Sequence, residues 1–267
     1  MLWTFPVCPP KNATEFRKRR RRMRSPYSVL FPECEVDGFS RSNIALIFYS
    51  FINSVVEDDH VVVDLGAGRG AFVESTSSRY LKKLAVFKGR CAKIIGLDVD
   101  PIVLENPLVD EAKIFKVGEP LPLDDNSVDV VFSDWVLEHV EHPDKFIAEV
   151  NRILKPGGWF CARTPNRWGM IGLAKALIPE KLESWILSKL QPNRQEHDVF
   201  PTFYRMNSVG QIGQAFSKRQ WNNHTFCDGY EVGYFTRSPI LIWFGYLYHK
   251  LMPKRLGLVL FVFTQKK

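Results

Sequence analysis

Residues 61–74 read VVVDLGAGRGAFVE. Three consecutive valines followed by glycines are typical of a strand that is buried on both faces, as in a parallel sheet. Gly66, Gly68 and Gly70 then remove three side chains where the chain leaves the strand and enters a helix. Backbone N–H groups can approach a ligand closely at such a turn. The stretch therefore predicts a strand, a ligand-binding loop and a helix in succession.

Apolar runs and helical patterns alternate around this stretch. We expect helices over residues 40–57, 71–87 and 143–154, and strands at 61–66, 92–100, 112–118, 127–134 and 159–164. Ser40 or Ser42 is available to cap the first helix, and residues 155–158, KPGG, should end the third. Strands that alternate with helices predict an α/β fold with a doubly wound, mostly parallel sheet and right-handed crossovers.

The alternation breaks after the fifth expected strand. Residues 165–206 hold a helix candidate at 173–190 and a polar, aromatic segment, and we interpret them as a substrate-covering insertion. A helix at 208–219 and strands at 221–232 and 256–267 should complete the sheet. Residues 1–39 are predicted to be a basic, irregular lead-in, so that residues 40–267 form the domain.

Composition narrows the class of protein. The chain has 267 residues, of which 45% are hydrophobic and 24% charged, which suits one large domain with a proper core. Its five cysteines include no CxxC pair, which argues against a disulfide framework or a zinc site and favours a reducing compartment. No apolar run is long enough to span a bilayer, and the first residues lack a signal-peptide core. We therefore expect a cytoplasmic protein.

The formal net charge of +7 is concentrated near the N-terminus, where residues 16–25 read FRKRRRRMRS. Such a block can bind nucleic acid, anionic lipid or an acidic partner. A solvated, self-repelling tail is the alternative. The sequence leaves both open.

Two acids help to identify the ligand of the glycine loop. Asp64 lies two residues before Gly66. A carboxylate there can accept a hydrogen bond from a cationic amine but makes no favourable contact with a pyrophosphate. Asp98 ends the second strand, where an acid can accept both ribose hydroxyls. The loop also satisfies the loose dinucleotide pattern GxGxxG/A, so an NAD(P)-dependent oxidoreductase is an alternative. Residues 121–158, however, have no counterpart in a dehydrogenase.

Taken together, these motifs resemble the class I S-adenosylmethionine-dependent methyltransferases, and specifically their small-molecule, type 11-like group. The match covers roughly residues 60–165, and its motifs are DxGxGxG at 64–70, LPLDDNSVD at 121–129, LEH at 137–139 and LKPGG at 154–158. The resemblance implies a Rossmann-like sheet of seven strands with an antiparallel last strand, a helical insertion after strand five, and S-adenosyl-L-methionine as the cofactor.

The resemblance also implies residue roles. Gly66 and Gly68 would border the methionine part of the cofactor, and Asp64 would lie near its amino group. Asp98 would hold the ribose hydroxyls, and Val99 would lie along the adenine. The structural alternative is that both acids are helix N-caps.

The remaining residues expected at the cofactor are Gly70, Glu119, Ser133, Asp134 and Trp135. Many relatives carry an Asp shortly after the third strand that meets the adenine amino group, and Glu119 is the substitute here. Ser133, Asp134 and Trp135 follow the fourth strand and would line the methionine side.

Methyl transfer from a sulfonium is an in-line displacement, and alignment of the acceptor with the methyl group supplies most of the gain in rate. A hydroxyl acceptor also needs a base, worth a factor of about 10²–10⁴. His139 is one candidate, and the alternative is that it packs at the start of a helix. A second candidate is His197, with Glu196 or Asp198 beside it and Tyr204 close by in sequence. A solvated polar loop is the alternative there.

No metal is expected. Some relatives that methylate quinone precursors hold a divalent cation with Glu-x-x-Glu-His. Trp135 takes the place of the first of those acids here, and Glu138 and His139 alone would suit a hard cation poorly.

Residues 133–136, Ser-Asp-Trp-Val, contain neither the (Asp/Asn)-Pro-Pro-aromatic motif nor the Pro-Cys nucleophile of base methyltransferases. Nucleic acid is therefore not the expected acceptor, although RNA ribose chemistry stays open. Residues 240–252, ILIWFGYLYHKLM, suit either a helix in the membrane interface or a helix packed on the sheet between the last two strands. Sheet packing is favoured, because each face of such a sheet needs cover.

The sequence thus predicts a methyltransferase acting on a small-molecule, lipid-linked or glycan-linked acceptor, with O-methylation favoured over N- or C-methylation. Peripheral contact with the inner membrane face stays open. A dinucleotide-dependent oxidoreductase and a non-catalytic protein that keeps only the methyltransferase fold are the rivals.

Overall fold

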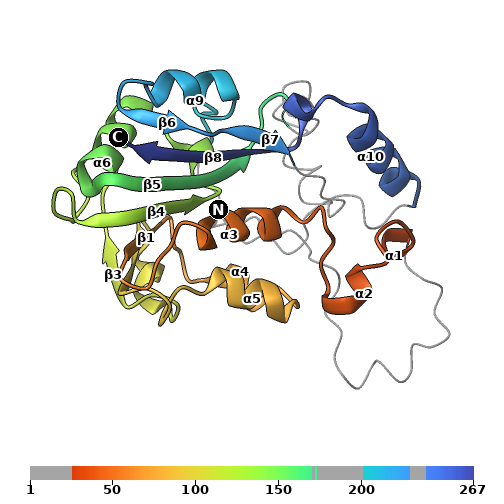
Figure 1. Ribbon diagram of the computed structural model, residues 1–267, viewed down its shortest axis with the longest axis horizontal. Helices are drawn as coiled ribbons and strands as arrows, with labels where there is room; N and C mark the ends of the chain where they lie inside the picture. The colour runs from red at the N-terminus through yellow and green to blue at the C-terminus, as the bar shows by residue number, and fades with distance from the viewer. Residues whose placement is uncertain (1–25, 170–171, 173–200, 229–238) are drawn as a thin grey trace.

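The structure is a computed structural model that describes residues 26–169, 172, 201–228 and 239–267. Its centre is one sheet in the order β3-β2-β1-β4-β5-β8-β6, with β7 also paired to β8 (Figure 1). The strands are β1 (Val61–Leu65), β2 (Lys93–Asp98), β3 (Glu111–Ile114), β4 (Val128–Asp134), β5 (Leu154–Pro165), β6 (Trp221–Asn223), β7 (Phe226–Asp228) and β8 (Val259–Lys266). The predicted doubly wound α/β sheet is confirmed.

Strands β1 to β5 pair in parallel, and β8 pairs antiparallel with β5, β6 and β7. Among the described strands, β8 alone is therefore reversed, as expected for the last strand. The sheet has eight strands rather than seven because the expected strand at 221–232 is divided into β6 and β7. His224, between the two, donates its N–H to Phe263 of β8 at 2.8 Å.

Hydrophobic clusters lie on both faces of the sheet. On one face, α3 (Ile44–Asn53), α4 (Ala71–Ser75) and α5 (Arg79–Ala85) pack around buried residues such as Phe48 and Val62. On the other, α6 (Pro143–Ile153) and α9 (Val209–Ala215) pack around residues such as Val150 and Phe216. The 3-10 helices η1 (Pro101–Glu105) and η2 (Leu137–His139) follow β2 and β4.

Several predicted boundaries are wrong. Asn43, not Ser40 or Ser42, caps α3, and its Oδ1 accepts the Leu46 N–H at 3.0 Å. The helix expected at 71–87 is two short helices, and Ser78 caps the second. β5 begins at Leu154 rather than at residue 159, so the KPGG segment lies inside the strand assignment instead of ending a helix. Extended backbone at Leu154 ends α6.

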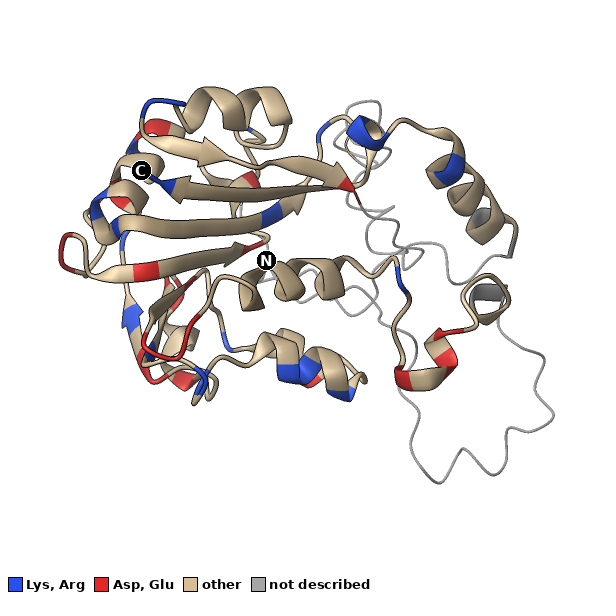
Figure 2. Ribbon diagram, in the orientation of Figure 1, with Lys and Arg blue, Asp and Glu red and all other residues tan. Residues whose placement is uncertain are grey.

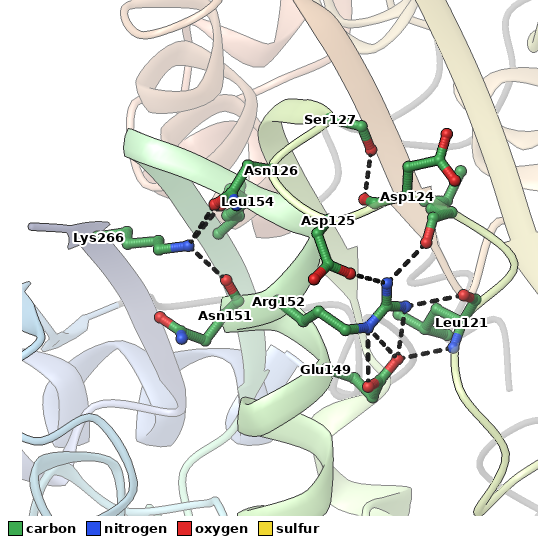
Figure 3. Close-up of polar contacts among 11 residues, drawn as sticks. Leu121, Asp124, Asp125, Asn126, Ser127, Glu149, Asn151, Arg152, Leu154 and Lys266 are labelled. Atoms are coloured by element: carbon green, nitrogen blue, oxygen red, sulfur yellow. Dashed lines mark hydrogen bonds and ion pairs between the residues drawn. The ribbon is translucent and has the colours of Figure 1, made fainter.

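The LPLDDNSVD motif is held against α6 by Arg152 (Figure 3). The guanidinium donates to the carbonyls of Leu121 at 2.9 Å and Leu123 at 2.8 Å, and it pairs with Asp125 and Glu149, each at 2.8 Å. Nearby, Lys266 Nζ donates to the carbonyl groups of Asn151 and Leu154 at the end of α6, at 2.6 and 2.7 Å. This motif is therefore structural, at the edge of the sheet where β4 begins.

The N-terminal lead-in is not wholly irregular, because residues 26–37 contain α1 (Pro26–Leu30) and α2 (Cys34–Asp37). Among the described elements, α1 packs against α10 (Pro239–Leu251), which continues into η5 (Lys254–Leu256) and then β8. Ile242 of α10 is buried in a small separate cluster with Phe31 and Cys34. The favoured prediction that this helix packs on the sheet is therefore wrong.

In Figure 1, α1 and α10 lie to the right of the sheet, on the side to which the arrows of β4 and β5 point. Figure 2 shows basic but no acidic residues on α10. None of the described helices has both the length and the apolar character needed to cross a membrane. The helix expected at 173–190 lies outside the described residues.

Candidate functional site

The loop after β1 depends on its glycines. Gly66, Gly68 and Gly70 have φ values of 87°, 48° and 77°, in the left-handed region that side chains disfavour. A Cβ on Gly66 would also collide with the side chain of Val136, and one on Gly70 would come within 2.8 Å of Asn106 Oδ1. The loop is therefore closely packed between the segments that follow β2 and β4.

Asp98 faces this loop from the end of β2. Its Oδ2 accepts the N–H of Gly68 at 2.8 Å, and its Oδ1 accepts the N–H of Asp100 at 3.0 Å. Each oxygen keeps a second lone pair for a hydroxyl group. The capping alternative does not hold for either acid, because Asp100 caps η1 and Asp64 lies inside β1.

Asn106, directly after η1, supports the loop and was not predicted. Its Nδ2 donates to the carbonyls of Ala67 at 3.2 Å and Gly68 at 3.1 Å, and its Oδ1 accepts the N–H of Leu108 at 2.9 Å. The side chain is buried. No sequence motif marks it, because its partners are backbone groups about forty residues away along the chain.

Three carboxylates from adjacent strands converge at this edge of the sheet: Asp64 of β1, Asp98 of β2 and Asp134 of β4. Burial raises the pKa of Asp64 well above its usual range, and the charges of Asp134 and then Asp98 raise it further. A cation bound here would relieve that repulsion, whereas a pyrophosphate would increase it. The donor set therefore fits a ligand with sulfonium and ammonium groups and ribose hydroxyls better than it fits a dinucleotide.

Asp134 forms a buried ion pair that the sequence reasoning missed. Asp134 and Arg163 are register partners on β4 and β5, and the guanidinium meets the two carboxylate oxygens at 2.5 and 2.7 Å. Tyr49 of α3 donates its hydroxyl to Asp134 at 3.2 Å, and burial raises the Tyr49 pKa well above its usual range. The Arg163 guanidinium also lies within 6 Å of the rings of Phe48, Tyr49, Phe72 and Trp135. An arginine near the end of an apolar strand was the available signal.

Trp135 and Ser133 flank Asp134. Trp135 is buried, has a positive φ of 59°, and donates its N–H to the carbonyl of Arg163 at 3.0 Å. Ser133 is buried too, and its hydroxyl donates to the carbonyl of Leu65 at 2.9 Å, joining β4 to β1. Their predicted contact with the cofactor stays a prediction.

Val99 and Glu119 were expected near the adenine. Val99 is half-buried directly after Asp98. Glu119 is exposed in the turn after β3, where it pairs with Lys116 at 3.7 Å. Both roles also stay predictions.

A second buried polar group lies on the other face of the sheet. Glu138 of η2 is 1% exposed, and its Oε2 accepts the hydroxyl of Thr164 at 2.8 Å. Asn207 donates to the same Thr164 oxygen at 2.8 Å. Burial raises the pKa of Glu138 to about 7. The second carboxylate oxygen, Oε1, has no hydrogen-bond partner within the part of the chain that the structure describes.

His139, the first predicted base, lies beside the described end of the insertion. Its Nδ1 is 2.7 Å from the carbonyl oxygen of Pro201. A carbonyl only accepts, so Nδ1 carries the proton and, in the neutral ring, Nε2 carries the lone pair. The N–H groups of Phe203 and Tyr204 donate to the carbonyl of Glu138 at 2.8 and 3.3 Å. The other candidate, His197, lies outside the described residues.

Among the described residues, one group of three possible metal ligands lies close together: Glu57, Asp59 and His60. Both acids are exposed, and the group precedes β1 at the edge of the sheet opposite the three carboxylates. Exposed acidic groups of this kind are common without an ion, so it is not part of this site.

Comparison with known proteins agrees with this geometry. The family model described as a methyltransferase domain matches residues 63–162. A probable S-adenosylmethionine-dependent methyltransferase of Mycolicibacterium smegmatis is 41% identical over 80 residues, which cover 28% of this chain and 30% of that protein. Phosphoethanolamine N-methyltransferase 1 of Triticum aestivum is 35% identical over 136 residues, or 46% of this chain and 24% of that protein. The chain thus spans about a third or less of the length of these relatives.

A solved structure shares the fold. It is a chain from the complex between the Haloferax volcanii Trm112 methyltransferase activator and a methyltransferase, with a TM-score of 0.52 and 18% identity over 82% of this chain and 89% of that chain. The sheet order, the glycine loop with its acids and the segment matched by the family model all indicate the same fold and the same class of ligand. Together with the geometry of the glycine loop and its acids, these comparisons support a class I S-adenosylmethionine-dependent methyltransferase domain over residues 63–162, with S-adenosylmethionine as its cofactor.

Proposed function

We propose that this protein transfers a methyl group from S-adenosylmethionine to a small-molecule, lipid-linked or glycan-linked acceptor, with an oxygen acceptor favoured. The observation that carries the proposal is the convergence of Asp64, Asp98 and Asp134 beside a glycine loop with left-handed backbone. That arrangement suits a cationic nucleoside. The cofactor supplies an activated methyl group when bound, so the main task of the protein is alignment.

The proposed division of labour follows from the geometry. Asp98 accepts the ribose hydroxyls while Gly68 fixes its orientation through the 2.8 Å hydrogen bond. Asp64 and Asp134 provide negative charge for the cationic part of the ligand. Arg163 holds Asp134 in one orientation through two hydrogen bonds, which limits how far that charge can move.

An oxygen acceptor is favoured because His139 is in the tautomer that a general base needs. The Pro201 carbonyl holds the proton on Nδ1, which makes Nε2 the basic nitrogen of the neutral ring. The name of the wheat relative gives a nitrogen acceptor, which makes N-methylation the second candidate. Tritiated methyl transfer from S-adenosylmethionine to panels of hydroxyl-bearing and amine-bearing lipids would separate the two. His139→Ala should slow transfer to the hydroxyl panel by about 10²–10⁴ and transfer to amines much less.

The segment 165–206 is proposed to cover the acceptor, within a domain that spans residues 40–267. Support comes from its described end: residues 201–204 lie against η2, directly beside His139. A cytoplasmic location with peripheral membrane contact belongs to the same proposal, because a lipid-linked acceptor would be met at a bilayer surface.

The test is thermal stabilisation of the whole chain by S-adenosylhomocysteine compared with NAD. The expected result is a concentration-dependent rise in Tm with the first ligand only. A rise with NAD alone would overturn the proposal in favour of an oxidoreductase. A rise with S-adenosylhomocysteine but no methyl transfer to any panel would favour the non-catalytic binding protein.

A matched pair of variants assigns the ribose role. Asp98→Ala should abolish the shift with S-adenosylhomocysteine, whereas Asp124→Ala, an exposed acid at the opposite edge of the sheet, should keep it. If Asp98→Ala keeps the shift and still unfolds cooperatively, Asp98 does not hold the ribose.

A further inference from the structure

Helix α10 presents its apolar face to solvent. Ile240, Trp243, Phe244, Leu247 and Leu251 are 79%, 53%, 57%, 53% and 69% exposed. With about 100° of rotation per residue, these five side chains fall within an arc of about 100°. We call them the apolar stripe. A surface helix of a globular domain normally buries such a face, so the stripe indicates a site for an apolar partner.

The orientation of α10 is fixed from its other side. Ile242, which projects opposite the stripe, is fully buried against Phe31 and Cys34. The ring of Tyr246 meets that of Phe31 edge to face at a centroid distance of 6.0 Å. Because this side already packs on the N-terminal segment, the helix cannot bury the stripe by rotating without losing that cluster.

Cations gather at the C-terminal end of the stripe. Lys250 lies with its Nζ 4.7 Å from the centroid of the Tyr246 ring, and Lys254 and Arg255 follow in η5. A cavity of about 480 Å³ opens here, and the charged residues lining it include Arg41, Lys250, Lys254 and one acid, Asp228. Basic groups therefore border an apolar surface, with a recess of a size that could receive an anionic headgroup.

The N-terminal helix α1 packs against α10 on the side away from the stripe. In the sequence, α1 directly follows the arginine-rich segment, residues 16–25, seven of which are Lys or Arg.

The acids near this surface lie outside α10 and η5. Asp37 of α2 accepts hydrogen bonds from the Ser78 hydroxyl and the Tyr80 N–H, both at 2.9 Å, and Glu33 accepts the N–H of Arg41 at 3.3 Å. Glu35 of α2 is exposed and Asp228 lines the cavity, whereas residues 239–257 contain no acid.

We infer that α10 and η5 form a docking surface for a bilayer containing anionic phospholipid. An apolar face that includes Trp, bordered by Lys and Arg, is the composition of a helix that lies in the membrane interface. Thirteen residues are too few for a helix to span the bilayer. A second copy of the chain would bring the same cations together, and charge repulsion disfavours that occupant.

The location of the surface connects docking with the site. α10 continues through η5 into β8, whose first residue, Val259, pairs with Pro165 at the end of β5. The three carboxylates lie at this same edge of the sheet. A docked molecule would therefore direct its cofactor edge toward the lipid. The idea that docking brings the cofactor edge to a lipid acceptor rests on the proposed function, whereas docking to the bilayer does not.

Flotation of the whole chain with vesicles tests the inference. We expect it to float with vesicles of phosphatidylcholine and phosphatidylglycerol in equal parts at 0.1 M NaCl, and at least tenfold less with phosphatidylcholine alone. Trp243→Ser with Phe244→Ser should reduce binding at least tenfold. Val117→Ser with Val209→Ser, exposed apolar residues elsewhere, is the matched control and should bind like the wild type. Lys250→Gln with Lys254→Gln and Arg255→Gln should weaken binding, and so should 0.5 M NaCl.

Wild-type protein that stays at the bottom of the gradient with anionic vesicles overturns the inference. Equal flotation of the Trp243 and Phe244 variant overturns it as well, because the arginine-rich segment alone would then be the anchor. Dimers in analytical ultracentrifugation that this variant abolishes, or capture of an acidic protein in place of vesicles, would assign the stripe to a protein partner.

Thermal shift with S-adenosylhomocysteine, run on the same samples, separates this inference from the proposed function. A chain that floats without any shift refutes only the methyltransferase proposal. A chain that shifts without floating refutes the docking surface, and with it the proposed membrane contact, but leaves the methyltransferase proposal standing.

Discussion

Two arginine–carboxylate clusters stabilise opposite edges of the same sheet, and they differ in their exposure to water. At the edge where the parallel strands end, the side chains of Arg163 and Asp134 are 3% and 16% exposed. At the edge where they begin, Arg152 is 26% exposed and its partner Asp125 is 70% exposed. The chemistry of the two pairs is the same, but only the first lies where water screens it little.

This difference in exposure matches the different roles of the two edges of the sheet. Arg152 bonds two backbone carbonyls as well as two carboxylates and so ties a loop to α6, and the carbonyl bonds are weakened little by water. Arg163 holds a carboxylate beside two further acids, in an environment that raises the pKa of Asp64. Charges kept in low dielectric act strongly on a ligand, and they are also costly to leave without a partner.

The largest expected effect comes from Arg163→Met. Removing the guanidinium leaves the Asp134 charge nearly buried, with Tyr49 as its remaining hydrogen-bond donor among the contacts described above. We expect a loss of about 3–5 kcal/mol in the free energy of unfolding, measured with urea. The double variant Asp134→Asn with Arg163→Met should recover more than half of that loss. If it unfolds as easily as the single variant, the stability came from packing and not from the pair.

A second effect tests burial of a single acid on the other face. The pKa of Glu138 is 4.5 in an unfolded chain and about 7 when folded, so the folded state binds the proton more tightly. The free energy of unfolding should therefore fall as pH rises from about 4.5 to about 7, by about 3 kcal/mol in total.

Glu138→Gln removes that titration and keeps the shape. Relative to the wild type, the variant should gain about 3 kcal/mol between pH 4.5 and pH 8 in urea unfolding. Comparing the two proteins at each pH cancels the contributions of Asp64 and other groups. A difference that does not change with pH would show that folding does not shift the pKa of Glu138.

A smaller effect is expected from Arg152→Ala, which breaks the network of Figure 3. The Leu121 and Leu123 carbonyls lose their donor but can turn to water, so we expect a loss of about 1–2 kcal/mol in urea unfolding. The shift with S-adenosylhomocysteine should be unchanged. Loss of that shift would mean that the two edges are coupled through the sheet.

The smallest effect should come from Asp125→Ala. This carboxylate is largely exposed and is one of several partners of Arg152, so its removal should cost at most about 1 kcal/mol. The cost should shrink further in 0.5 M NaCl, because salt screens exposed pairs. A loss comparable to that of Arg163→Met would remove the contrast between the two edges.

Much of the fold could be predicted because its signals are local. The apolar runs at β1, β2 and β4 are bounded by glycine or acid, and the α6 pattern repeats with helical period. The glycine loop with Asp64 and Asp98 was also readable, since backbone conformation and strand ends constrain residue type directly. The predicted ends of helices were wrong where a neighbouring residue could also act as the cap. Asn43, for example, caps α3 in place of Ser40 or Ser42.

Other parts of the site could not be read in this way. Tyr49, Asp134 and Arg163 come from three elements and meet only because α3 packs on that face of the sheet. Asn106 binds backbone carbonyls, and Glu138 the Thr164 hydroxyl, that are distant in sequence. No pattern in the chain marks such contacts, because side chains that bind backbone impose little on the type of the partner residue.

The sequence by itself determined the alternation of strands and helices and the glycine loop, because these follow from periodicity and backbone freedom. The cofactor class came from the resemblance of its motifs to a known family. Only the tertiary structure decided which acids are buried together, and which face of α10 meets the solvent. The sequence of an amphipathic helix has the same apolar pattern whether the helix packs on a sheet or lies on a bilayer. In this protein, α1 packs against the side of α10 opposite the apolar stripe and so leaves the stripe exposed. That contact joins residues more than 200 positions apart in the sequence.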